Sequence, residues 1–478
     1  MDHAAPPSQK SEKLPFEQTK VRRTILISYW IVVLLAVPLW WYTTSIERLS
    51  LPVSRINSQR GKECLGQNDL ELTVTEGALS SNVYGISVVP VLEEPVAEGR
   101  RLSIPSLQVS HIPQLLTSLF APSSSPSGSG SASHLVAKYA PHYRLAFTVL
   151  NEDAADGTAV IGWDIRNSIS RHLSSLLHRI SALHNFTIES QVRYHAPLAF
   201  EPHHVGLDNE GIYGLTQDDL KVFVNSAEWT LSSSASNDPV LHFILFIPSA
   251  SHTPLRILDA KNNPTSSNAF LLPQWGGVVL FNLQSDLAPQ TFLTTSDLDQ
   301  VFSIFRLQLL SLLGVPRLPP NIVPANPSDP LTDWQLDSLY RQRAIENAFS
   351  SKETLESIAK LVNEIPNMPL GQDVRGDVQD ALTALEKVYP AATNSPILAL
   401  QYSSRALTLA SRAFFNPGML ALLYFPAEHK YAVYTPLFAP VAVPLLATAL
   451  REWKKARARK DTDKQAEEKD APLREREH

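Results

Sequence analysis

The sequence predicts a mixed α/β body with a C-terminal helical section, flanked by two transmembrane helices. Three observations support this prediction. Two long uncharged runs lie near the ends of the 478-residue chain. Between them, short apolar runs typical of buried strands alternate with amphipathic helical patterns. These strand signals stop beyond about residue 330, where helical patterns continue.

The first uncharged run, residues 24–45, follows Lys20, Arg22 and Arg23 and leaves an N-terminal tail at residues 1–23. A cleaved signal peptide has a shorter apolar core and a small-residue cleavage site behind it. Here the run ends in LWWYTT, which places aromatic rings where they anchor a helix at a membrane surface. We therefore expect a retained signal-anchor helix.

The second uncharged run, residues 431–450, just spans a hydrocarbon core of about 30 Å as a helix. Six Lys or Arg residues and one Glu follow at positions 451–460, so we expect the charged tail 451–478 to stay in the cytosol. Both termini are then cytosolic, and residues 46–430 are lumenal or extracellular. The cations Arg48 and Arg55 behind the first run make its own orientation less decisive.

The region 46–430 carries 36 acidic and 26 basic side chains, which argues against nucleic acid as a partner. Its one valid glycosylation acceptor, Asn185-Phe186-Thr187, agrees with a lumenal location. The single cysteine, Cys64, excludes an internal disulfide framework. An unpaired thiol and an intermolecular disulfide both stay open for Cys64.

Three prolines, Pro436, Pro440 and Pro444, interrupt the second run at every fourth residue. A proline in a helix leaves the carbonyl four residues earlier without its usual donor, and this spacing puts the carbonyls on one face. Lipid cannot satisfy them, so another helix, polar side chains or water must. A bent lone span is one alternative. We expect instead that this face packs against a partner helix.

Inside the region, residues 121–133 (APSSSPSGSGSAS) predict a flexible Ser/Gly/Pro loop rather than a domain boundary. The apolar runs predict strands at residues 84–92, 143–150, 186–194, 241–247 and 277–283. One amphipathic helix has its apolar face from Ile169 to Leu183. A second helix is expected to be capped by Ser296 and to end at Gly314.

Residues 331–413 are expected to be mainly helical. Thr332 and Gln335 form a capping box at the head of a helix that reaches about Glu364. Further helical patterns cover residues 374–388 and 396–413.

The usual catalytic signatures are absent, including HExxH, GxSxG, GxxxxGK[ST] and GxGxxG. The densest group of potential metal ligands is Glu201, His203 and His204, but no second ligand pair accompanies it. A Cys–His nucleophile would need Cys64, which no local pattern supports. We therefore expect no catalytic, cofactor or metal site in this chain.

Two further groups of residues favour structural roles. Asp218 and Asp219 are typical of the start of a helix or turn, where carboxylates suit the local dipole. Trp229, Trp275 and Trp334 are expected as core or interface anchors rather than as a ligand cage.

Five stretches are long and specific enough to compare with known families. One is FNPGMLALLYFPAEHKYAVYTPLFAPVAVPLL at residues 415–446, and the others lie at 38–52, 183–197, 223–231 and 334–368. Together they cover both predicted spans and the region between them. In order and spacing they resemble the PIG-S family, whose members are subunits of the GPI transamidase.

The resemblance implies a two-span protein of the endoplasmic reticulum membrane with most of its mass in the lumen. The transamidase cleaves the C-terminal signal from a proprotein and joins the new carboxyl end to a glycosylphosphatidylinositol (GPI) by an amide bond. A Cys–His pair on a different, protease-like subunit performs this reaction. The resemblance therefore implies a non-catalytic accessory subunit that supports assembly, and a part in presenting the proprotein or the GPI stays open.

The partners implied by the resemblance are the other transamidase subunits, including the protease-like catalytic chain, and the membrane lipid. Two other functions stay open at this point. A membrane-tethered lumenal enzyme would use residues such as Glu201, His203 and His204. A free-standing adaptor of the endoplasmic reticulum would bind substrate outside the complex.

Overall fold

The computed structural model describes residues 19–44, 48–60, 83–90, 92–120, 136–156, 159–205, 211–225, 228–229, 231, 236–283, 290–326, 331–365, 368, 370–419 and 427–474. The chain divides into two units, each described by itself below. Unit 1 comprises residues 1–57, 354–379 and 410–478, and unit 2 comprises residues 58–353 and 380–409. Cys64 and the predicted loop 121–133 lie outside the described residues.

A five-stranded sheet in the order β11-β12-β9-β4-β6 organises unit 2. The strands are β4 (His142–Asn151), β6 (Asn185–Arg193), β9 (Val240–Ile247), β11 (Ala269–Leu272) and β12 (Gly276–Leu280). All neighbours pair in parallel except the edge strand β11, which is antiparallel to β12. Strands β4 and β9 are buried along almost their whole length, which explains their continuous apolar sequences. Four of the five predicted strands lie in this sheet and are confirmed.

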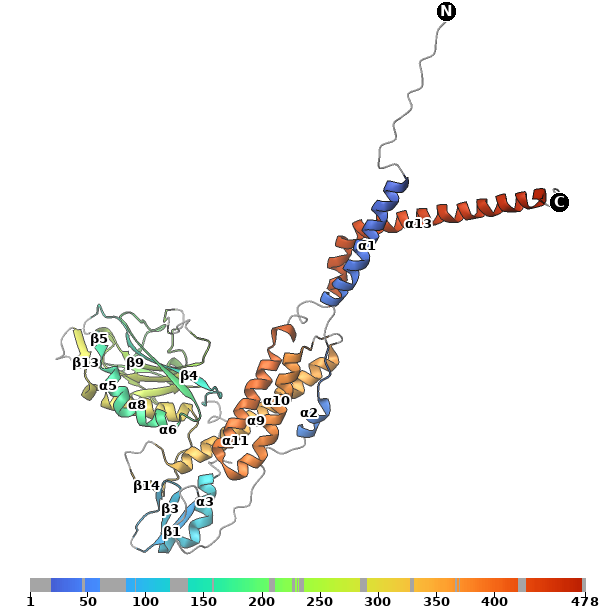
Figure 1. The fold of residues 1–478 in the computed structure, drawn as a ribbon. Helices are drawn as coiled ribbons and strands as arrows, with labels where there is room; N and C mark the ends of the chain where they lie inside the picture. The colour runs from blue at the N-terminus through green and yellow to red at the C-terminus, as the bar shows by residue number, and fades with distance from the viewer. Residues whose placement is uncertain are drawn as a thin grey trace, which may run out of the picture. The chain divides into compact units, whose positions relative to one another are not determined.

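Helices α5 (Ile165–His172), α6 (Ser174–Arg179) and α8 (Thr295–Leu312) cover one face of the sheet (Figure 1). An aromatic core fills the layer between sheet and helices. The rings of Phe147 and Phe243 from the sheet stack at 5.1 Å, and those of Phe302 and Phe305 from α8 meet edge to face at 5.5 Å. Strands β5 (Ala159–Trp163) and β13 (Gln290–Leu293) form a separate parallel pair.

The opposite face of the sheet carries a second aromatic cluster, in which Phe223 packs at 5.0 Å from Phe246 and at 5.7 Å from the buried Trp229. Trp275 is partly buried against the same cluster. A small sheet of β7 (His203–Val205), β8 (Ile212–Leu215) and β10 (Leu255–Ile257) lies in the same part of the chain, followed after β8 by helix α7 (Gln217–Lys221). The helix start predicted at Asp218-Asp219 is confirmed, because Asp219 forms a capping box with Thr216.

Two local predictions about helices were wrong. The predicted helix along the face from Ile169 to Leu183 is interrupted at Leu173, which separates α5 from α6. Helix α8 is capped by Thr294 rather than by Ser296. The backbone N–H of Thr294 donates to Asp297 Oδ2 at 2.8 Å, and this reciprocal box requires the acidic residue three positions later. Ser296 therefore lies inside the first turn of the helix.

A second, smaller sheet in unit 2 has the order β1-β3-β2-β14. Its strands are β1 (Gly85–Val89), β2 (Val96–Glu98), β3 (Arg101–Pro105) and β14 (Val323–Pro324), accompanied by the 3₁₀ helix η2 (Ser106–His111) and helix α3 (Ile112–Phe120). The predicted strand at 84–92 is confirmed as the shorter β1. The core of this small sheet is formed by Leu102, Ile104 and Leu116 together with Trp334, which lies in the first turn of α9 (Asp333–Glu364).

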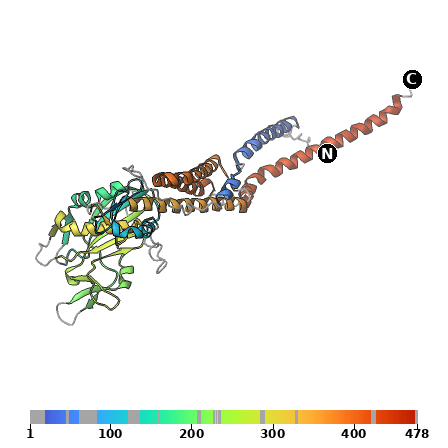
Figure 2. The same cartoon turned by 90° about the horizontal axis from the view of Figure 1, so that it is seen from below.

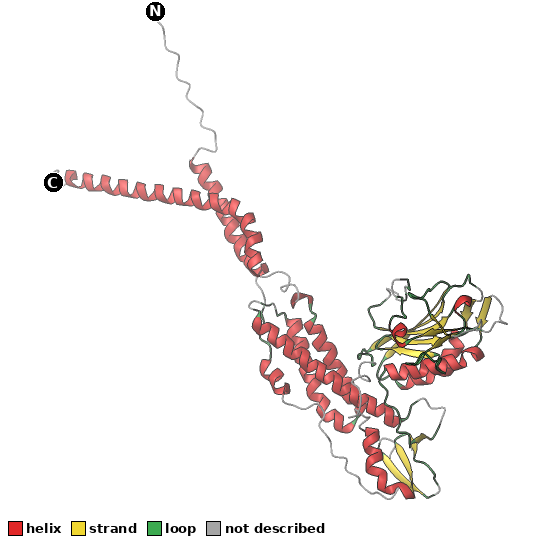
Figure 3. Cartoon of the chain, turned by 180° about the vertical axis from the view of Figure 1, so that it is seen from behind, coloured by secondary structure: helices red, strands yellow, loops and turns green. Residues whose placement is uncertain are grey.

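Beyond the sheets the chain is helical, with α9 (Asp333–Glu364), α10 (Gln372–Asn394) and α11 (Pro396–Phe414) (Figure 3). The three predicted helices are confirmed. Alanines allow close approach of their axes, because Ala344, Ala391 and Ala399 from the three helices share one buried cluster.

Unit 1 contains α1 (Thr19–Thr44), α2 (Val53–Arg60), whose last residues lie in unit 2, and α13 (Ala427–Arg474). Helix α13 is one long helix that leads to the C-terminal end of the chain (Figure 2), and its residues include Pro436, Pro440 and Pro444. In the part of the chain that the structure describes, no helix has the combined length and apolarity needed to cross a membrane. The spans at 24–45 and 431–450 stay predictions.

Candidate functional site at the head of helix α9

The first turn of α9 is held by the capping box that the sequence predicts. The backbone N–H of Thr332 donates to Gln335 Oε1 at 3.1 Å, and the N–H of Gln335 donates back to Thr332 Oγ1 at 3.4 Å. The Gln335 side-chain amide also donates to the carbonyl of Pro316, 2.8 Å away, in the segment behind α8. The box therefore fixes the helix start and ties it to the preceding chain.

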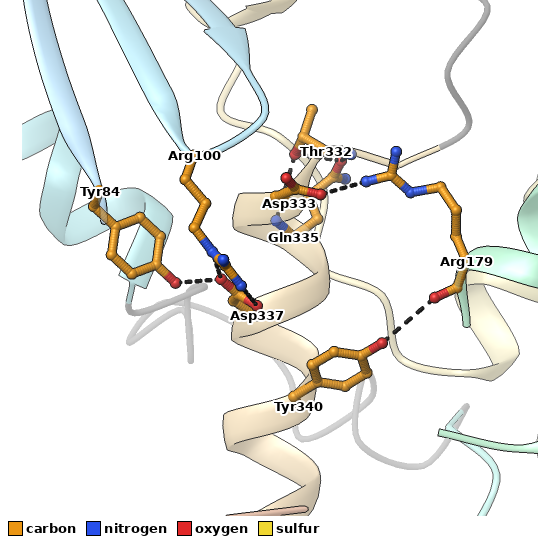
Figure 4. Close-up of polar contacts among 8 residues, drawn as sticks. All are labelled: Tyr84, Arg100, Arg179, Thr332, Asp333, Gln335, Asp337 and Tyr340. Carbon is orange, nitrogen blue, oxygen red and sulfur yellow. Dashed lines mark hydrogen bonds and ion pairs between the residues drawn. The ribbon is translucent and has the colours of Figure 1, made fainter. Parts of the chain in front are cut away.

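The small sheet is attached to α9 through Asp337, one turn further on (Figure 4). Arg100, in the turn before β3, donates from Nε to Asp337 Oδ2 at 2.7 Å and from Nη2 to Oδ1 at 3.1 Å. The hydroxyl of Tyr84, just before β1, donates to the same Oδ2 at 2.6 Å. The side chain of Asp337 is 2% exposed and that of Arg100 is 21% exposed. This bidentate pair is therefore largely shielded from water.

The surroundings keep the Tyr84 hydroxyl protonated. Burial, together with the hydrogen bond to Asp337, raises the pKa of Tyr84 far above its ordinary value, while the cation of Arg341 opposes this shift. The hydrogen bond to Asp337 raises the pKa of Arg100, so the guanidinium stays charged. Arg341 Nη2 donates to the Tyr84 oxygen at 3.0 Å, and the rings of Tyr84 and Trp334 lie 4.5 Å apart.

The large α/β body is attached to the other side of the same turns. Arg179, the last residue of α6, forms an ion pair with Asp333, and the hydroxyl of Tyr340 donates to the Arg179 carbonyl at 3.4 Å (Figure 4). Arg343 reaches the end of α8, where its Nη2 donates to the carbonyls of Leu313 at 2.9 Å and Ala137 at 3.1 Å. These contacts hold the body and the small sheet to one helix.

We call this set of residues the α9 joint: Tyr84, Arg100, Arg179, Thr332, Asp333, Gln335, Asp337, Tyr340, Arg341 and Arg343. Its carboxylates are paired with arginines from two different sheet-bearing parts. The Arg100–Asp337 pair is the more shielded one, so breaking it leaves a partly buried charge without its partner, whereas Asp333 and Arg179 are more exposed and form a weaker pair. The joint therefore links α9 to both sheet-bearing parts through ion pairs and hydrogen bonds.

A second cluster lies at the carboxyl ends of parallel strands β4 and β9. The chain leaves β4 toward β6 on one side and later places β9 on the other, which makes this edge a topological switch point. Glu152 follows β4, and its carboxylate accepts from the Ser249 N–H at 2.9 Å. His252, in the 3₁₀ helix η3 (Ala250–His252), places Nδ1 at 2.6 Å from Glu152 Oε1 and Nε2 at 3.4 Å from Glu201.

The structure thus brings Glu201 to His252, a residue that the sequence pattern did not indicate, whereas His203 and His204 have other neighbours. His203 lies in β7 at 3.4 Å from Asp219, and the ring of His204 packs edge-on against Tyr213 at 5.4 Å. Among the described residues, no group of three or more His, Cys, Asp or Glu side chains could hold a metal ion. Glu201 is 92% exposed, so it forms a weak partner for His252.

A positional signal could have found Glu152 and His252. Both follow strands that the sequence predicts as buried, and parallel neighbours place their carboxyl ends at one edge. The hydroxyls of Ser249 and Ser251 lie 2.9 Å from one another, and no bond between either hydroxyl and His252 is observed in the described residues. The Glu152–His252 pair therefore has the orienting half of a hydrolytic triad without a paired nucleophile there.

The remaining predicted site residues are exposed. Asn185 opens the edge strand β6, with its side chain accessible, and Thr187 of the same acceptor is exposed as well. Pro436, Pro440 and Pro444 are exposed along α13. The hydroxyl of Thr448 donates to the carbonyl of Pro444 at 2.9 Å.

In unit 1, Arg48 has a local structural role. Its Nη2 donates to the carbonyl of Val362 in the last turn of α9 at 2.8 Å, and the Leu49 N–H donates to Leu370 at 3.1 Å. A cation at the carboxyl end of a helix is favourable because the final carbonyls lack partners. A folding role therefore accounts for one of the cations that follow the first predicted span.

The fold is that of a mixed α/β chain in which two sheet-bearing parts contact one long helix, α9, through the α9 joint. A family model described as "Phosphatidylinositol-glycan biosynthesis class S protein" matches residues 27–89 and 109–459. The chain belongs to this family, PIG-S, as its sequence stretches indicated.

Curated relatives agree with this assignment. A Rattus norvegicus protein named GPI-anchor transamidase component PIGS is 35% identical over 66% of this chain and 58% of its own length. The Homo sapiens protein of the same name is 35% identical over 65% of this chain and 56% of its own length. A Schizosaccharomyces pombe protein named GPI transamidase component PIG-S homolog is 27% identical over 94% of this chain and 87% of its length. The chain thus spans less than two thirds of the mammalian relatives.

Proposed function

We propose that this chain is a non-catalytic accessory subunit of the GPI transamidase, the complex of the endoplasmic reticulum that replaces the C-terminal signal of proproteins with a GPI anchor. The observation that carries this proposal is membership of the PIG-S family, together with relatives named as components of that enzyme. The α9 joint supports a structural role, because its carboxylates bind arginines of the same chain.

The proposed partners are the other transamidase subunits, including the protease-like chain that would carry the Cys–His pair, and the membrane lipid. We further propose that residues 24–45 and 431–450 span the membrane, with both termini in the cytosol and 46–430 in the lumen. Their uncharged sequences and flanking cations support this topology. Large apolar side chains are also exposed along both helices, among them Leu34, Leu35 and Val443.

Glycosylation tests the lumenal side. We expect Asn185 to carry a glycan, so endoglycosidase should increase the gel mobility of the wild-type protein and leave Asn185→Gln unchanged. Asn263→Gln is the matched control, since its acceptor is blocked by Pro264 and its removal should change nothing. A wild-type protein that endoglycosidase does not shift would contradict the assignment of Asn185.

The proline face of α13 is proposed to pack against a helix of another subunit. Replacing Pro436, Pro440 and Pro444 with leucine should weaken co-purification of the other subunits, because the unpaired carbonyls that favour a partner disappear. Ala442→Leu with Ala449→Leu is the control, since both positions lie on the opposite side of the helix. Normal co-purification of the proline variant would refute this packing role.

An enzyme is the second candidate, favoured by the position of the Glu152–His252 pair at the switch point of the sheet. The accessory-subunit proposal predicts that His252→Gln leaves GPI attachment unchanged when this variant replaces the cells' own copy of the subunit. His203→Ala with His204→Ala should likewise retain attachment. Loss of attachment at normal complex abundance would favour the enzyme instead.

A contact of the chain with the proprotein or the GPI is a further part of the proposal. Cross-linking of the chain to either substrate would test it.

A further inference from the structure

The net charge along helix α13 changes sign soon after the apolar run 431–450 ends. Residues 451–460 contain six Lys or Arg and one Glu, whereas residues 461–470 contain five Asp or Glu and two Lys. Each block is about 15 Å long as a helix. The block next to the apolar run therefore carries a net +5, and the block beyond it carries a net −3.

The backbone makes the cationic block a direct extension of the preceding segment. Helix α13 extends from Ala427 to Arg474, so these cations begin within the same helix, one residue after Leu450. Arg451, Trp453, Lys454 and Arg457 are exposed. The Arg457 guanidinium lies over the Trp453 ring, 5.6 Å from its centroid. An amphipathic indole beside cations is typical of the boundary between hydrocarbon and headgroups.

The cations are distributed around the helix rather than along one stripe. At about 100° per residue, sequence positions 451, 454 and 457 fall on one half of the circumference of an ideal helix, and positions 455, 459 and 460 fall mainly on the other half. A groove on a folded protein would contact one side of this helix. Lipid headgroups surround a helix on all sides, so a lipid surface fits the distribution better.

We propose that residues 451–460 bind the headgroups of anionic phospholipids in the cytosolic leaflet. This inference rests on the proposed span at 431–450. The clustered cations gather anionic lipid around the helix, and the acidic block 461–470 is repelled by the same surface and points away from it. The charge reversal thereby fixes the depth at which the helix leaves the membrane.

Fluorescence of Trp453 provides the test in full-length protein reconstituted into nanodiscs. Two lipid mixtures have the same fractions of phosphatidylcholine and phosphatidylserine, with brominated quenching chains on one lipid or on the other. The signal of a Trp453→Phe variant is subtracted to isolate this residue from the other tryptophans. We expect phosphatidylserine, per molecule, to quench Trp453 about fivefold more than phosphatidylcholine does at low salt, and less so at high salt.

Two triple variants sharpen the test. Replacing Arg451, Lys454 and Arg457 with Gln removes half of the six cations and should clearly reduce the preference. Replacing Lys464, Lys469 and Arg474 with Gln removes as many cations from the same helix and should preserve it. Equal quenching by both lipids would overturn the lipid inference while leaving the span intact, as would equal effects of the two triple variants. Absence of quenching by either lipid would refute the span itself, and this inference with it.

Discussion

Removal of the Asp337 carboxylate is expected to loosen the small sheet from α9. Asp337→Ala leaves the Arg100 guanidinium without its bidentate partner and the Tyr84 hydroxyl without its acceptor. Breaking a buried pair by deleting one partner costs about 3–5 kcal/mol. Arg100 is 21% exposed, so water partly compensates its charge, and we expect about 2–3 kcal/mol.

Hydrogen exchange followed by mass spectrometry measures this effect locally. If β1 and β3 open as one unit, a loss of 2–3 kcal/mol speeds their amide exchange by about 30- to 150-fold. Strands β4 and β9 belong to the core of the large sheet, which is separate from the core of the small sheet, so their amides should exchange as in the wild type. A local readout is preferable here because a multi-part chain has no single free energy of unfolding.

Asp333→Ala is the matched control, one turn earlier on the same helix. Its ion pair with Arg179 has side chains that are 36% and 27% exposed, so its loss should cost less than about 1 kcal/mol. Equal changes for the two variants would refute the argument that burial sets the strength of the joint. Accelerated exchange in β4 and β9 would show that the small sheet is not attached independently.

The remaining predictions concern pH and glycine geometry. Burial lowers the pKa of His184 and His242 to about 4, whereas an unfolded histidine titrates near 6.5. The unfolded chain alone takes up these protons as the pH falls, so each histidine should cost roughly 3 kcal/mol of stability between pH 6.5 and 4, with full stability above that window. The protection of β4 and β9 against hydrogen exchange, corrected for the intrinsic pH dependence of exchange, should fall less across this range for His242→Gln, and protection independent of pH would contradict the prediction. Gly276→Ala should lower the melting temperature strongly, because its Cβ would lie 2.0 Å from the His242 carbonyl oxygen. Gly376→Ala, in open space within α10, should be neutral or stabilising by up to about 1 kcal/mol. Equal melting temperatures of the Gly276→Ala and Gly376→Ala variants would contradict this geometry.

Local signals predicted the elements well. The apolar run of β9 and the Thr332–Gln335 box are each contained within a few residues, so the sequence alone locates them. The wrong cap at Ser296 has a local cause as well, since Thr294 with Asp297 satisfies the box and Ser296 does not. Element type therefore follows from nearest neighbours along the chain.

The contacts of the α9 joint could not be predicted in this way. Arg100 and Asp337 are separated by 237 positions, and nothing in their local sequence distinguishes them from solvated surface charges. Glu152 and His252 are similarly 100 positions apart and meet because β4 and β9 are parallel neighbours. Such pairs depend on sheet order and domain placement, which periodicity does not encode.

The most direct test of the account is purification of the tagged, full-length protein from membranes in mild detergent, with mass spectrometry of the chains that accompany it. The accessory-subunit proposal predicts a stoichiometric set that includes a protease-like chain bearing a Cys–His pair and several multi-span proteins. The proposal would be contradicted by a protein that purifies alone at full yield, provided that hydrogen exchange shows the α9 joint to be folded. That result would favour a free-standing adaptor or an enzyme in residues 46–430.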